Sequence, residues 1–338
     1  MSARITSLDV ARRAGVSQSA VSRVFTPGRS ASARTAEKVR QAAEELGYRP
    51  NVLARSLITG QSRVIGLVVA YLDNYFYPEV VEKLSNALQA RGYHVMMFMA
   101  QQTAGNIDDV VDEILDYQVD GIVTASVALS SDLAARCQAA GVPVVLFNRT
   151  QDDPRLSAVS SDNFKGGQKL AEFLVASGHR RIAHIAGWEG AATQRDREAG
   201  FVDGLARAGL GMHARAVGNF KHEDAAEAAR RLMSGPDKPD AIFVANDHMA
   251  FAVMDVLRSE LGLDIPGDIS IVGFDDVPPA GWPAYDLTTV RQDGSAMVAQ
   301  TVEMLLGQIE HADHTPRRVV LDAPLIIRGS ARMPEGWT

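Results

Sequence analysis

Polar and aromatic side chains follow the apolar segments in the second, larger part of the sequence, and they are well suited to binding a ligand. Those directly or soon after such a segment are Phe76, Tyr77, Asn148, Arg197, Phe220, Asn246 and Asp275. Aromatic faces stack on rings, while amide, guanidinium and carboxylate groups form paired hydrogen bonds with polar substituents. This set suits a polar, ring-shaped ligand. Asn and Asp are also ordinary caps and turn formers, so any one of them can instead be structural.

Sequence motifs for catalysis are missing. The sequence contains no GxGxxG, Walker A, GxSxG or HExxH motif, which disfavours nucleotide-dependent, serine-hydrolase and zinc-protease chemistry. Lys165-Gly166-Gly167 is interpreted as the start of a helix rather than a phosphate loop. The HADH segment at 311–314 has a spacing compatible with metal binding, but it lies in a polar stretch after a helix. Cys137 lies on an apolar helix face, as a small buried residue does. We therefore expect no enzyme, no cofactor and no metal.

Alternating strands and helices must position the ligand-binding candidates. Strands are predicted at 64–70, 94–99, 121–125, 144–147, 181–186, 241–245, 269–273 and 325–329. Helices are predicted at 79–91, 107–117, 132–140, 166–177, 196–208, 225–233, 249–261 and 295–309. This alternation is typical of a parallel α/β architecture. A body of about 270 residues exceeds one usual open sheet, which predicts two subdomains with a cleft at the carboxyl ends of their strands.

The composition is that of a globular chain. With 338 residues, 46% hydrophobic and 22% charged, a largely disordered or collagen-like protein is excluded. The single cysteine excludes an internal disulfide framework. Residues 1–10 lack the apolar region of a secretory signal. The longest apolar runs are far shorter than the roughly 20 residues of a membrane span. We expect a cytoplasmic protein with no membrane partner.

The net charge of −7 hides an asymmetry between the two parts of the chain. Residues 1–60 hold ten Lys and Arg against four acidic residues, whereas the remainder holds 24 basic and 37 acidic residues. A small basic head on a large acidic body indicates that the head meets a polyanion. The alternative is a basic face that is merely solvated.

The basic head is predicted to contain three helices. The segment from Thr6 to Asp9 has the form of a capping box, and the helix that it starts ends at Gly15. Ser17 can cap a second helix over 18–24, and Ser32 a third that ends at Gly47. Two short helices joined by a tight turn that contains glycine are typical of a helix-turn-helix.

The second helix carries the side chains that could read DNA. In a helix-turn-helix, its first residues meet base edges in the major groove. Here these are Gln18 and Ser19, with Ser22 and Arg23 one turn later. Gln can pair bidentately with adenine, and Arg with guanine or a phosphate. The alternative is a three-helix structural unit with no DNA role.

A short helical turn is predicted at 51–57, where Leu53, Ala54 and Leu57 share one face. Isolated helices shorter than about 12 residues are marginal in water, so this segment is expected to fold only against a partner. The alternative is a simple linker between domains.

The segments SLDVARRAGVSQSAVSRVF, YRPNVLARSL and VIGLVV resemble the head, hinge and first strand of the LacI/GalR family of bacterial repressors, and the resemblance continues through the whole chain. It implies that Gln18 and Ser19 set operator preference and that a wedge at Leu57 enters the minor groove. Thr26 stands where the family often has Asn. The DNA-contacting residues implied are Thr6, Ser17, Gln18, Ser19, Ser22, Arg23, Asn51, Ala54 and Leu57.

For the body, the resemblance implies a type I periplasmic-binding-protein fold. Arg197 in RDREAGF matches an arginine that binds the effector in sugar-responsive members. Ala191 stands where purine-responsive members have an arginine, which favours a sugar or sugar acid. The other implied effector contacts are Phe76, Tyr77, Asn148, Phe220, Asn246 and Asp275, with Tyr75 replacing a usual proline.

We therefore expect an α/β protein: a helix-turn-helix head at 1–50, a hinge helix and linker at 51–62, and a ligand-binding body at 63–330. Its two parallel α/β subdomains would comprise 63–161 with 293–320, and 162–292 with 321–330. No heptad repeat follows the last strand, so a homodimer that reads pseudo-palindromic operator DNA is expected. The alternatives are a solute-binding protein without a DNA role, which the basic head disfavours, and an α/β enzyme.

Overall fold

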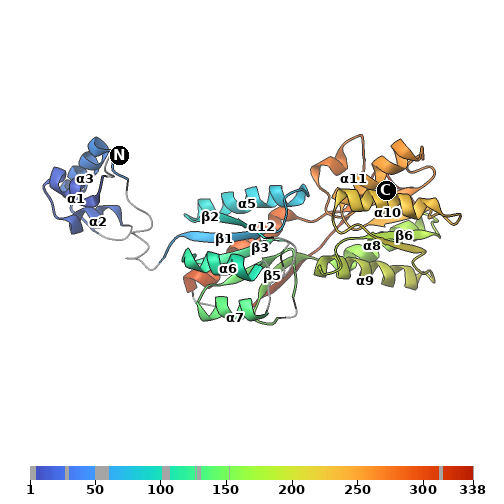
Figure 1. Cartoon of the computed structure of the whole chain (residues 1–338), viewed down its shortest axis with the longest axis horizontal. Coiled ribbons are helices and arrows are strands. Elements are labelled where there is room, and N and C mark those ends of the chain that lie inside the picture. Colours follow the sequence, from blue (N-terminus) through green and yellow to red (C-terminus); the bar gives the residue numbers. More distant parts are fainter. Residues whose placement is uncertain are drawn as a thin grey trace. The chain divides into compact units, whose positions relative to one another are not determined.

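The computed structural model describes residues 5–26, 30–49, 61–100, 107–125, 127, 131–151, 153–311 and 315–337. The chain divides into two compact units, Met1–Arg63 and Val64–Thr338, called here the head and the body (Figure 1). The part of the expected hinge that covers 51–60 lies outside the described residues. Among the described residues, no helix combines the length and the apolar character that crossing a lipid bilayer requires.

The head contains three helices around a small apolar core. They are α1 (Ser7–Ala14), α2 (Gln18–Phe25) and α3 (Ala33–Leu46). The expected capping box is formed: the Thr6 hydroxyl accepts from the backbone of Asp9, whose carboxylate accepts from the backbone of Thr6. Gly15 ends α1 with a φ of 65°, a left-handed conformation that glycine adopts without strain. The core consists of Val10, Ala11, Val21, Val39, Ala42 and Ala43.

The first half of the body, called here the N-subdomain, is built on a six-stranded parallel sheet with the order β11-β5-β4-β3-β1-β2. Its strands are β1 (Val64–Val69), β2 (His94–Met99), β3 (Gly121–Ala125), β4 (Val144–Phe147), β5 (Ser157–Ser161) and β11 (Arg318–Leu321). Helices α5 (Phe76–Ala90) and α12 (Gly294–His311) cover one face. Helices α6 (Ile107–Asp116) and α7 (Ser131–Ala139) cover the other (Figure 1).

The second half, called the C-subdomain, is built on a parallel sheet with the order β7-β6-β8-β9. Its strands are β6 (Ile182–Ala186), β7 (Ala214–Val217), β8 (Ala241–Val244) and β9 (Ser270–Val272). Its helices are α8 (Asn163–Ala176), α9 (Ala192–Arg207), α10 (His222–Ser234), α11 (Asp247–Asp255), the π-helical turn η2 (Val256–Glu260) and the 3₁₀ turn η3 (Pro278–Gly281). An antiparallel pair, β10 (Thr289–Val290) and β12 (Leu325–Ile326), lies beside it.

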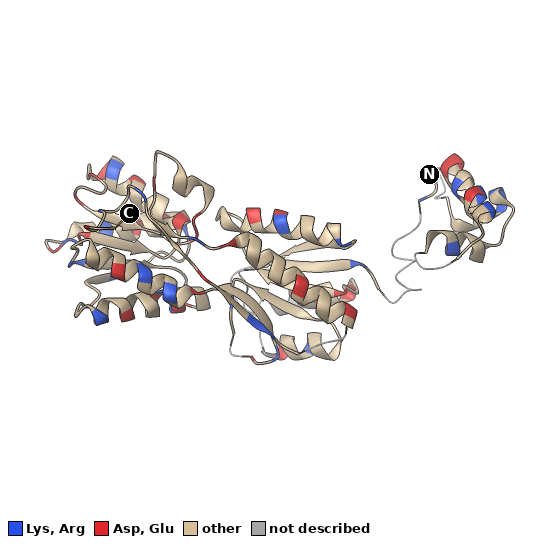
Figure 2. Cartoon of the chain, turned by 180° about the vertical axis from the view of Figure 1, so that it is seen from behind, with Lys and Arg blue, Asp and Glu red and all other residues tan. Residues whose placement is uncertain are grey.

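The chain passes between the subdomains after β5, after β10 and after β11. In the central strands β1, β3, β4, β6 and β8 the apolar side chains are almost all buried, which explains their near-continuous apolar runs. The edge strands β2, β7 and β11 are partly exposed. Lys and Arg occur on all three helices of the head, with acidic residues on α1 and α3, and basic and acidic residues are mixed over the helices of the body (Figure 2).

Some predicted boundaries were wrong. No bounds were predicted for strands β5, β7, β10 and β11. Strand β5 was missed because its sequence, SAVSS, is largely polar. Its residues are nevertheless buried, and the Ser157 hydroxyl accepts hydrogen bonds from Gln308 and from the backbone of Arg317. Helices α5, α8, α9, α10 and α11 begin two to four residues earlier than expected, and the last strand ends at Ile326 rather than 329.

Close backbone packing joins α8 to α9. A Cβ at Gly167 would lie 2.1 Å from the Arg197 carbonyl oxygen, and one at Gly200 would lie 1.9 Å from the Phe164 carbonyl oxygen. Lys165-Gly166-Gly167 therefore forms part of a helix start, with Asp162 as the N-cap. These glycines also let α9 approach α8 closely enough to bring Arg197 over the end of the sheet.

Candidate functional site

The predicted DNA-reading residues lie on α2 and at the caps of α1 and α2. Thr6 caps α1, and the Ser17 hydroxyl caps α2 by accepting from the backbone of Ala20 at 3.2 Å. Gln18, Ser19 and Arg23 are exposed on α2, whereas Ser22 is half-buried. Polar side chains on the outer face of the second helix have the placement that base reading requires.

Hydrogen bonds within the head orient two of these side chains. The Gln18 amide nitrogen donates to the Ser7 hydroxyl at 3.0 Å, and the Arg23 Nε donates to the Ser19 carbonyl at 3.4 Å. Both bonds are exposed, so either side chain can exchange its partner for a base edge at small cost. The other predicted DNA contacts, Asn51, Ala54 and Leu57, lie outside the described residues.

In the body, the predicted ligand-binding residues follow the carboxyl ends of strands in both subdomains. Phe76 and Tyr77 follow β1, Asn148 follows β4, Asn246 follows β8 and Asp275 follows β9. Phe220 follows β7, and Arg197 lies on α9, which follows β6. All of these residues are buried, with exposed fractions between 2% and 6%. The region where they lie between the two sheets is called here the cleft.

Arg197 is bonded on three sides in the cleft. Its Nε donates to Asn163 Oδ1 at 2.9 Å, its Nη1 to the Ala245 carbonyl at 2.7 Å and its Nη2 to Asp275 Oδ1 at 3.2 Å. Its guanidinium carbon lies 3.7 Å from the centroid of the Phe274 ring. A planar fork that is stacked on an aromatic ring and bonded on three sides has a fixed orientation.

Asp275 connects the two subdomains. Its Oδ2 accepts from the Asn74 amide of the N-subdomain at 3.2 Å, while its Oδ1 accepts from Gln292 at 2.7 Å and from Arg197. Asn74 is itself held, because its Oδ1 accepts from the backbone of Phe76 at 3.0 Å. Burial raises the pKa of Asp275, and the Arg197 guanidinium and the two amide donors oppose that rise.

A second connection runs from the end of β4. The Arg149 Nη1 donates to the Thr193 hydroxyl of the C-subdomain at 3.2 Å. Its neighbour Asn148 donates from its amide nitrogen to the Tyr77 hydroxyl at 3.5 Å. The Asn148 Oδ1 is buried and has no hydrogen-bond partner among the described residues. A buried acceptor without a donor is costly, and a ligand hydroxyl would satisfy it.

Aromatic rings border the cleft in both subdomains. Phe76 and Tyr77 pack edge to face with a centroid distance of 5.4 Å, and Tyr77 packs in the same way on Tyr71. Phe220 lies in the C-subdomain against Gly187, where an added Cβ would be 2.2 Å from its ring. A side chain at residue 187 would therefore displace the Phe220 ring.

Three cleft residues have a strained backbone conformation. Asn148, Phe220 and Asp275 have φ angles of 55°, 59° and 127°. Asn tolerates the left-handed region, but a bulky Phe there and an Asp at 127° are uncommon. Residues held in such conformations cluster at ligand-binding sites, where the surrounding structure fixes them.

Asn246 and Asp247 fix the start of α11 and the loop that carries Asp275. The Asn246 Oδ1 caps α11 by accepting from the backbone of Met249 at 3.0 Å. The Asp247 carboxylate accepts from the backbone of Val277 at 3.1 Å and from the Thr289 hydroxyl at 2.6 Å. Burial, with the nearby Asp275 carboxylate, raises the pKa of Asp247 to about 7.

The structure adds residues that were not among the predicted site residues: Asn74, Arg149, Asn163, Thr193, Asp247 and Gln292. Asn74, Arg149, Thr193 and Asp247 stand close to predicted residues in the sequence, so their place after strands was a usable signal. Asn163 and Gln292 are far from their partners along the chain, at separations of 34 and 17 residues, and no local pattern indicates such pairings.

Comparison of the sequence with known protein families shows which family the chain belongs to. "Bacterial regulatory proteins, lacI family" matches residues 6–51, and "Periplasmic binding protein-like domain" matches residues 171–331. The ribose operon repressor of Escherichia coli (strain K12) is 31% identical over 96% of this chain and 99% of its own length. The chain belongs to the LacI family. It is a DNA-binding transcriptional regulator, which supports the repressor interpretation over a solute-binding protein without a DNA role.

Other LacI-family proteins match along nearly the whole chain. The HTH-type transcriptional repressor PurR of Vibrio vulnificus (strain CMCP6) is 30% identical over 96% of this chain and 98% of its own. A crystal structure of the lac repressor dimer bound to operator and the anti-inducer ONPF has a TM-score of 0.88, with 29% identity over 97% of this chain and 99% of that one. A complex of the regulator CelR with cellobiose has a TM-score of 0.73, with 30% identity over 97% and 100%. The predicted fold class is thus confirmed.

Proposed function

We propose that this LacI-family regulator is a cytoplasmic repressor that binds a pseudo-palindromic operator as a homodimer and is controlled by a sugar or sugar acid bound in the cleft. The observation that carries the proposal is the buried network of Arg197, Asp275 and Asn74, which joins the two subdomains at the carboxyl ends of their strands. A ligand that enters this network changes the contacts between the subdomains.

The DNA side of the proposal assigns base reading to Gln18, Ser19 and Arg23, and backbone contacts to Thr6, Ser17 and Ser22. These side chains lie on one short helix or at a helix start, and most are exposed. We assign minor-groove contacts to Asn51, Ala54 and Leu57. The proposed units are 1–50, 51–62 and 63–330. The lac repressor was crystallised as a dimer on operator, and a two-fold symmetric dimer matches a palindromic site.

The ligand side rests on the chemistry of the cleft. The Asn148 Oδ1 has no donor among the described residues, and a ligand hydroxyl would supply one. The Asp275 carboxylate and the Arg197 fork are already bonded within the protein, and a ligand hydroxyl can compete for these bonds in fixed directions. Aromatic rings at Phe76, Tyr77 and Phe220 offer faces or edges to the C–H groups of a sugar ring. The CelR relative binds cellobiose, and the E. coli relative is the repressor of a ribose operon.

We propose that the ligand controls operator binding because its affinity differs between two arrangements of the subdomains. A ligand shifts the equilibrium between two arrangements of the subdomains only as far as it prefers one of them. The hydrogen bonds from Asn74 to Asp275 and from Arg149 to Thr193 exist in the arrangement described here. A sugar that replaces or reinforces them is expected to change the spacing of the two hinge segments in the dimer. The network is a binding site in this proposal, and we propose no catalytic role for it.

The test is to incubate the purified protein with sheared genomic DNA of its source at about 0.15 M salt, which suppresses binding that depends on phosphates alone. The retained fragments are sequenced with and without a panel of sugars and sugar acids. A shared palindrome whose retention changes with one member of the panel supports the proposal. Retention that lacks any shared sequence under every condition contradicts it.

A further inference from the structure

A pocket of about 510 Å³ lies in the N-subdomain, away from the cleft. Its lining includes Pro143, Leu156 and Pro316, which stand just before β4, β5 and β11. Because the strands are parallel, the pocket lies at their amino ends, whereas the cleft lies at their carboxyl ends. At about 3.3 Å per residue, Pro143 and Asn148 are about 16 Å apart along β4. The pocket is therefore a separate space, called here the amino-end pocket.

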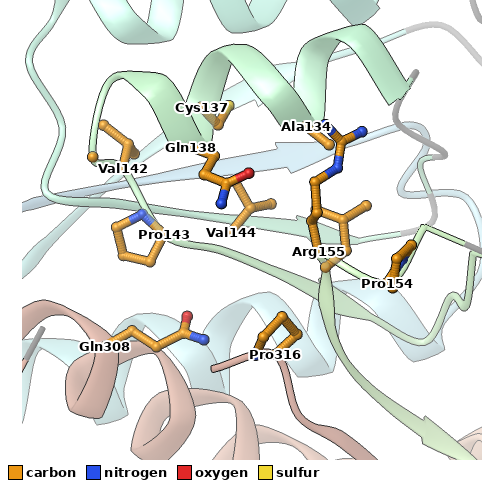
Figure 3. A pocket seen from close by; sticks show the side chains of 12 residues that line it. Ala134, Cys137, Gln138, Val142, Pro143, Val144, Pro154, Arg155, Gln308 and Pro316 are labelled. Carbon is orange, nitrogen blue, oxygen red and sulfur yellow. The ribbon is translucent and has the colours of Figure 1, made fainter. Parts of the chain in front are cut away.

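Most of the residues that line the amino-end pocket are apolar. Three prolines contribute, together with Val142, Val144, Leu156 and the α7 residues Ala134 and Cys137 (Figure 3). Proline rings and branched side chains at the ends of strands have little freedom to collapse into the space. Volumes of about 300–1,000 Å³ with apolar walls are usual for sites that hold small organic molecules.

One buried polar group in this lining lacks a partner among the described residues. Gln308 reaches from α12 toward the strand residues of the opposite wall (Figure 3), and its side chain is only 7% exposed. Its Nε2 donates to the Ser157 hydroxyl at 2.9 Å. Its Oε1 is buried and has no hydrogen-bond partner among the described residues. An unsatisfied buried acceptor is uncommon, and a donor from a bound molecule would satisfy it.

The charges of the lining are balanced within the protein. Arg155 donates from Nε and Nη2 to the two oxygens of Asp153, at 2.9 and 2.5 Å. Burial raises the pKa of the Cys137 thiol to about 11, so that group is neutral at physiological pH. The pocket therefore combines apolar side chains with the exposed Gln138 amide, one buried acceptor and no uncompensated charge from Arg155 and Cys137.

We propose that the amino-end pocket is a second small-molecule site, which takes a neutral, mainly apolar ring compound carrying one N–H or O–H donor for the Gln308 Oε1. Such a compound differs from the hydroxyl-rich ligand proposed for the cleft. The site does not depend on that ligand, since the two sets of lining residues share no member.

The test uses two probes of nearly equal shape. Indole has an N–H donor, and benzothiophene has none. Binding to the full-length protein is followed by NMR of methyl-labelled valine and leucine. Indole is expected to shift the methyl signals of Val142, Val144 and Leu156 and to leave Val277, beside the cleft, unchanged. It should bind about three- to tenfold more tightly than benzothiophene, which is the usual contribution of one hydrogen bond.

Gln308→Leu removes the acceptor and keeps the side-chain volume. It is expected to weaken indole binding about three- to tenfold and to leave benzothiophene binding unchanged. The matched control is Gln300→Leu, a half-buried position on the same helix that does not line the pocket, and it should change neither. Gln138→Trp fills the pocket from the exposed side of α7 and should abolish binding of both probes without touching the bond between Gln308 and Ser157.

Two results would overturn the proposal. One is saturation with indole that leaves the signals of Val142, Val144 and Leu156 unmoved. The other is an indole-to-benzothiophene affinity ratio that stays the same in Gln308→Leu, while Gln138→Trp still binds both probes. Circular dichroism of each variant identifies loss of folding separately.

Discussion

At the scale of single residues, hydrogen bonds and stacking on an aromatic ring together fix the orientation of the Arg197 guanidinium. Its three nitrogens donate to an amide oxygen, a backbone carbonyl and a carboxylate, and its plane lies over Phe274. Lysine has a compact charge without a planar fork, so it cannot reproduce this arrangement. The side chain therefore sets both the polarity and the directions of hydrogen bonding in the cleft.

Arg197→Ala is expected to abolish the response of operator binding to the effector while operator affinity without effector stays within about twofold. Because Asp275 then remains buried without its cation, the free energy of unfolding should fall by about 3–5 kcal/mol. Fluorescence anisotropy with labelled operator and urea unfolding measure the two effects. The control is Arg195→Ala, an exposed position on the same helix. A normal effector response in Arg197→Ala would place the ligand elsewhere.

The buried carboxylate of Asp247 makes stability depend on pH. Its pKa is raised to about 7 in the folded protein, from an ordinary value of 3.8. Between these values the folded state binds more protons than the unfolded state, so this group lowers stability as pH rises. Asp247→Asn removes the titration. The stability of the variant relative to wild type is thus expected to improve from pH 4 to pH 8, as measured by urea unfolding at each pH. A constant difference across that range would contradict this.

Many of the cleft residues could be predicted from their positions after strands, because parallel strands bring their carboxyl ends to one edge. The bond from Asn74 to Asp275 could not, since the two residues are 201 positions apart and only the packing of two subdomains joins them. The Asn148 Oδ1, which has no hydrogen-bond partner among the described residues, could not be predicted either. Whether a polar atom finds a partner depends on every neighbour in space.

At the scale of elements, the contact between α8 and α9 positions Arg197. Gly167→Ala would place a Cβ 2.1 Å from the Arg197 carbonyl oxygen, so the helices must separate. The expected loss is about 1–3 kcal/mol of unfolding free energy, together with weaker effector binding. The matched control is Gly307→Ala in α12, where no atom lies within 4 Å of the added Cβ. It should stabilise the protein by up to about 1 kcal/mol. Equal effects of the two substitutions would refute the packing argument.

The alternation of strands and helices was predictable from apolar runs and amphipathic spacing. The three helices of the head were predictable from their capping residues. Strand β5 was not predictable in this way. Its buried Ser157 hydroxyl is satisfied by donors from α12 and from the segment before β11, which lie far along the chain. Helix starts were predicted late where the first turn carries polar or aromatic residues of the cleft, as in α5 and α9. Those residues face the ligand region, so their types do not follow the helical pattern.

At the scale of the whole molecule, operator binding is proposed to require the hinge as well as the helix-turn-helix. Leu57→Ala is expected to lower operator affinity about tenfold or more and to reduce DNA bending, because the wedge that unstacks the central step is lost. Affinity for nonspecific DNA should stay unchanged, since phosphate contacts dominate it. Gel-shift titration and a circular-permutation bending assay test this. Unchanged bending would contradict the wedge role.

The central claim is that one ligand in the cleft controls DNA binding. The most direct measurement is the operator dissociation constant at increasing concentrations of each sugar and sugar acid, in wild type and in Arg197→Ala. We predict that one compound changes the constant of the wild type by about 5- to 150-fold, the usual range of allosteric coupling, and leaves that of the variant unchanged. An equal change in both proteins would contradict the claim.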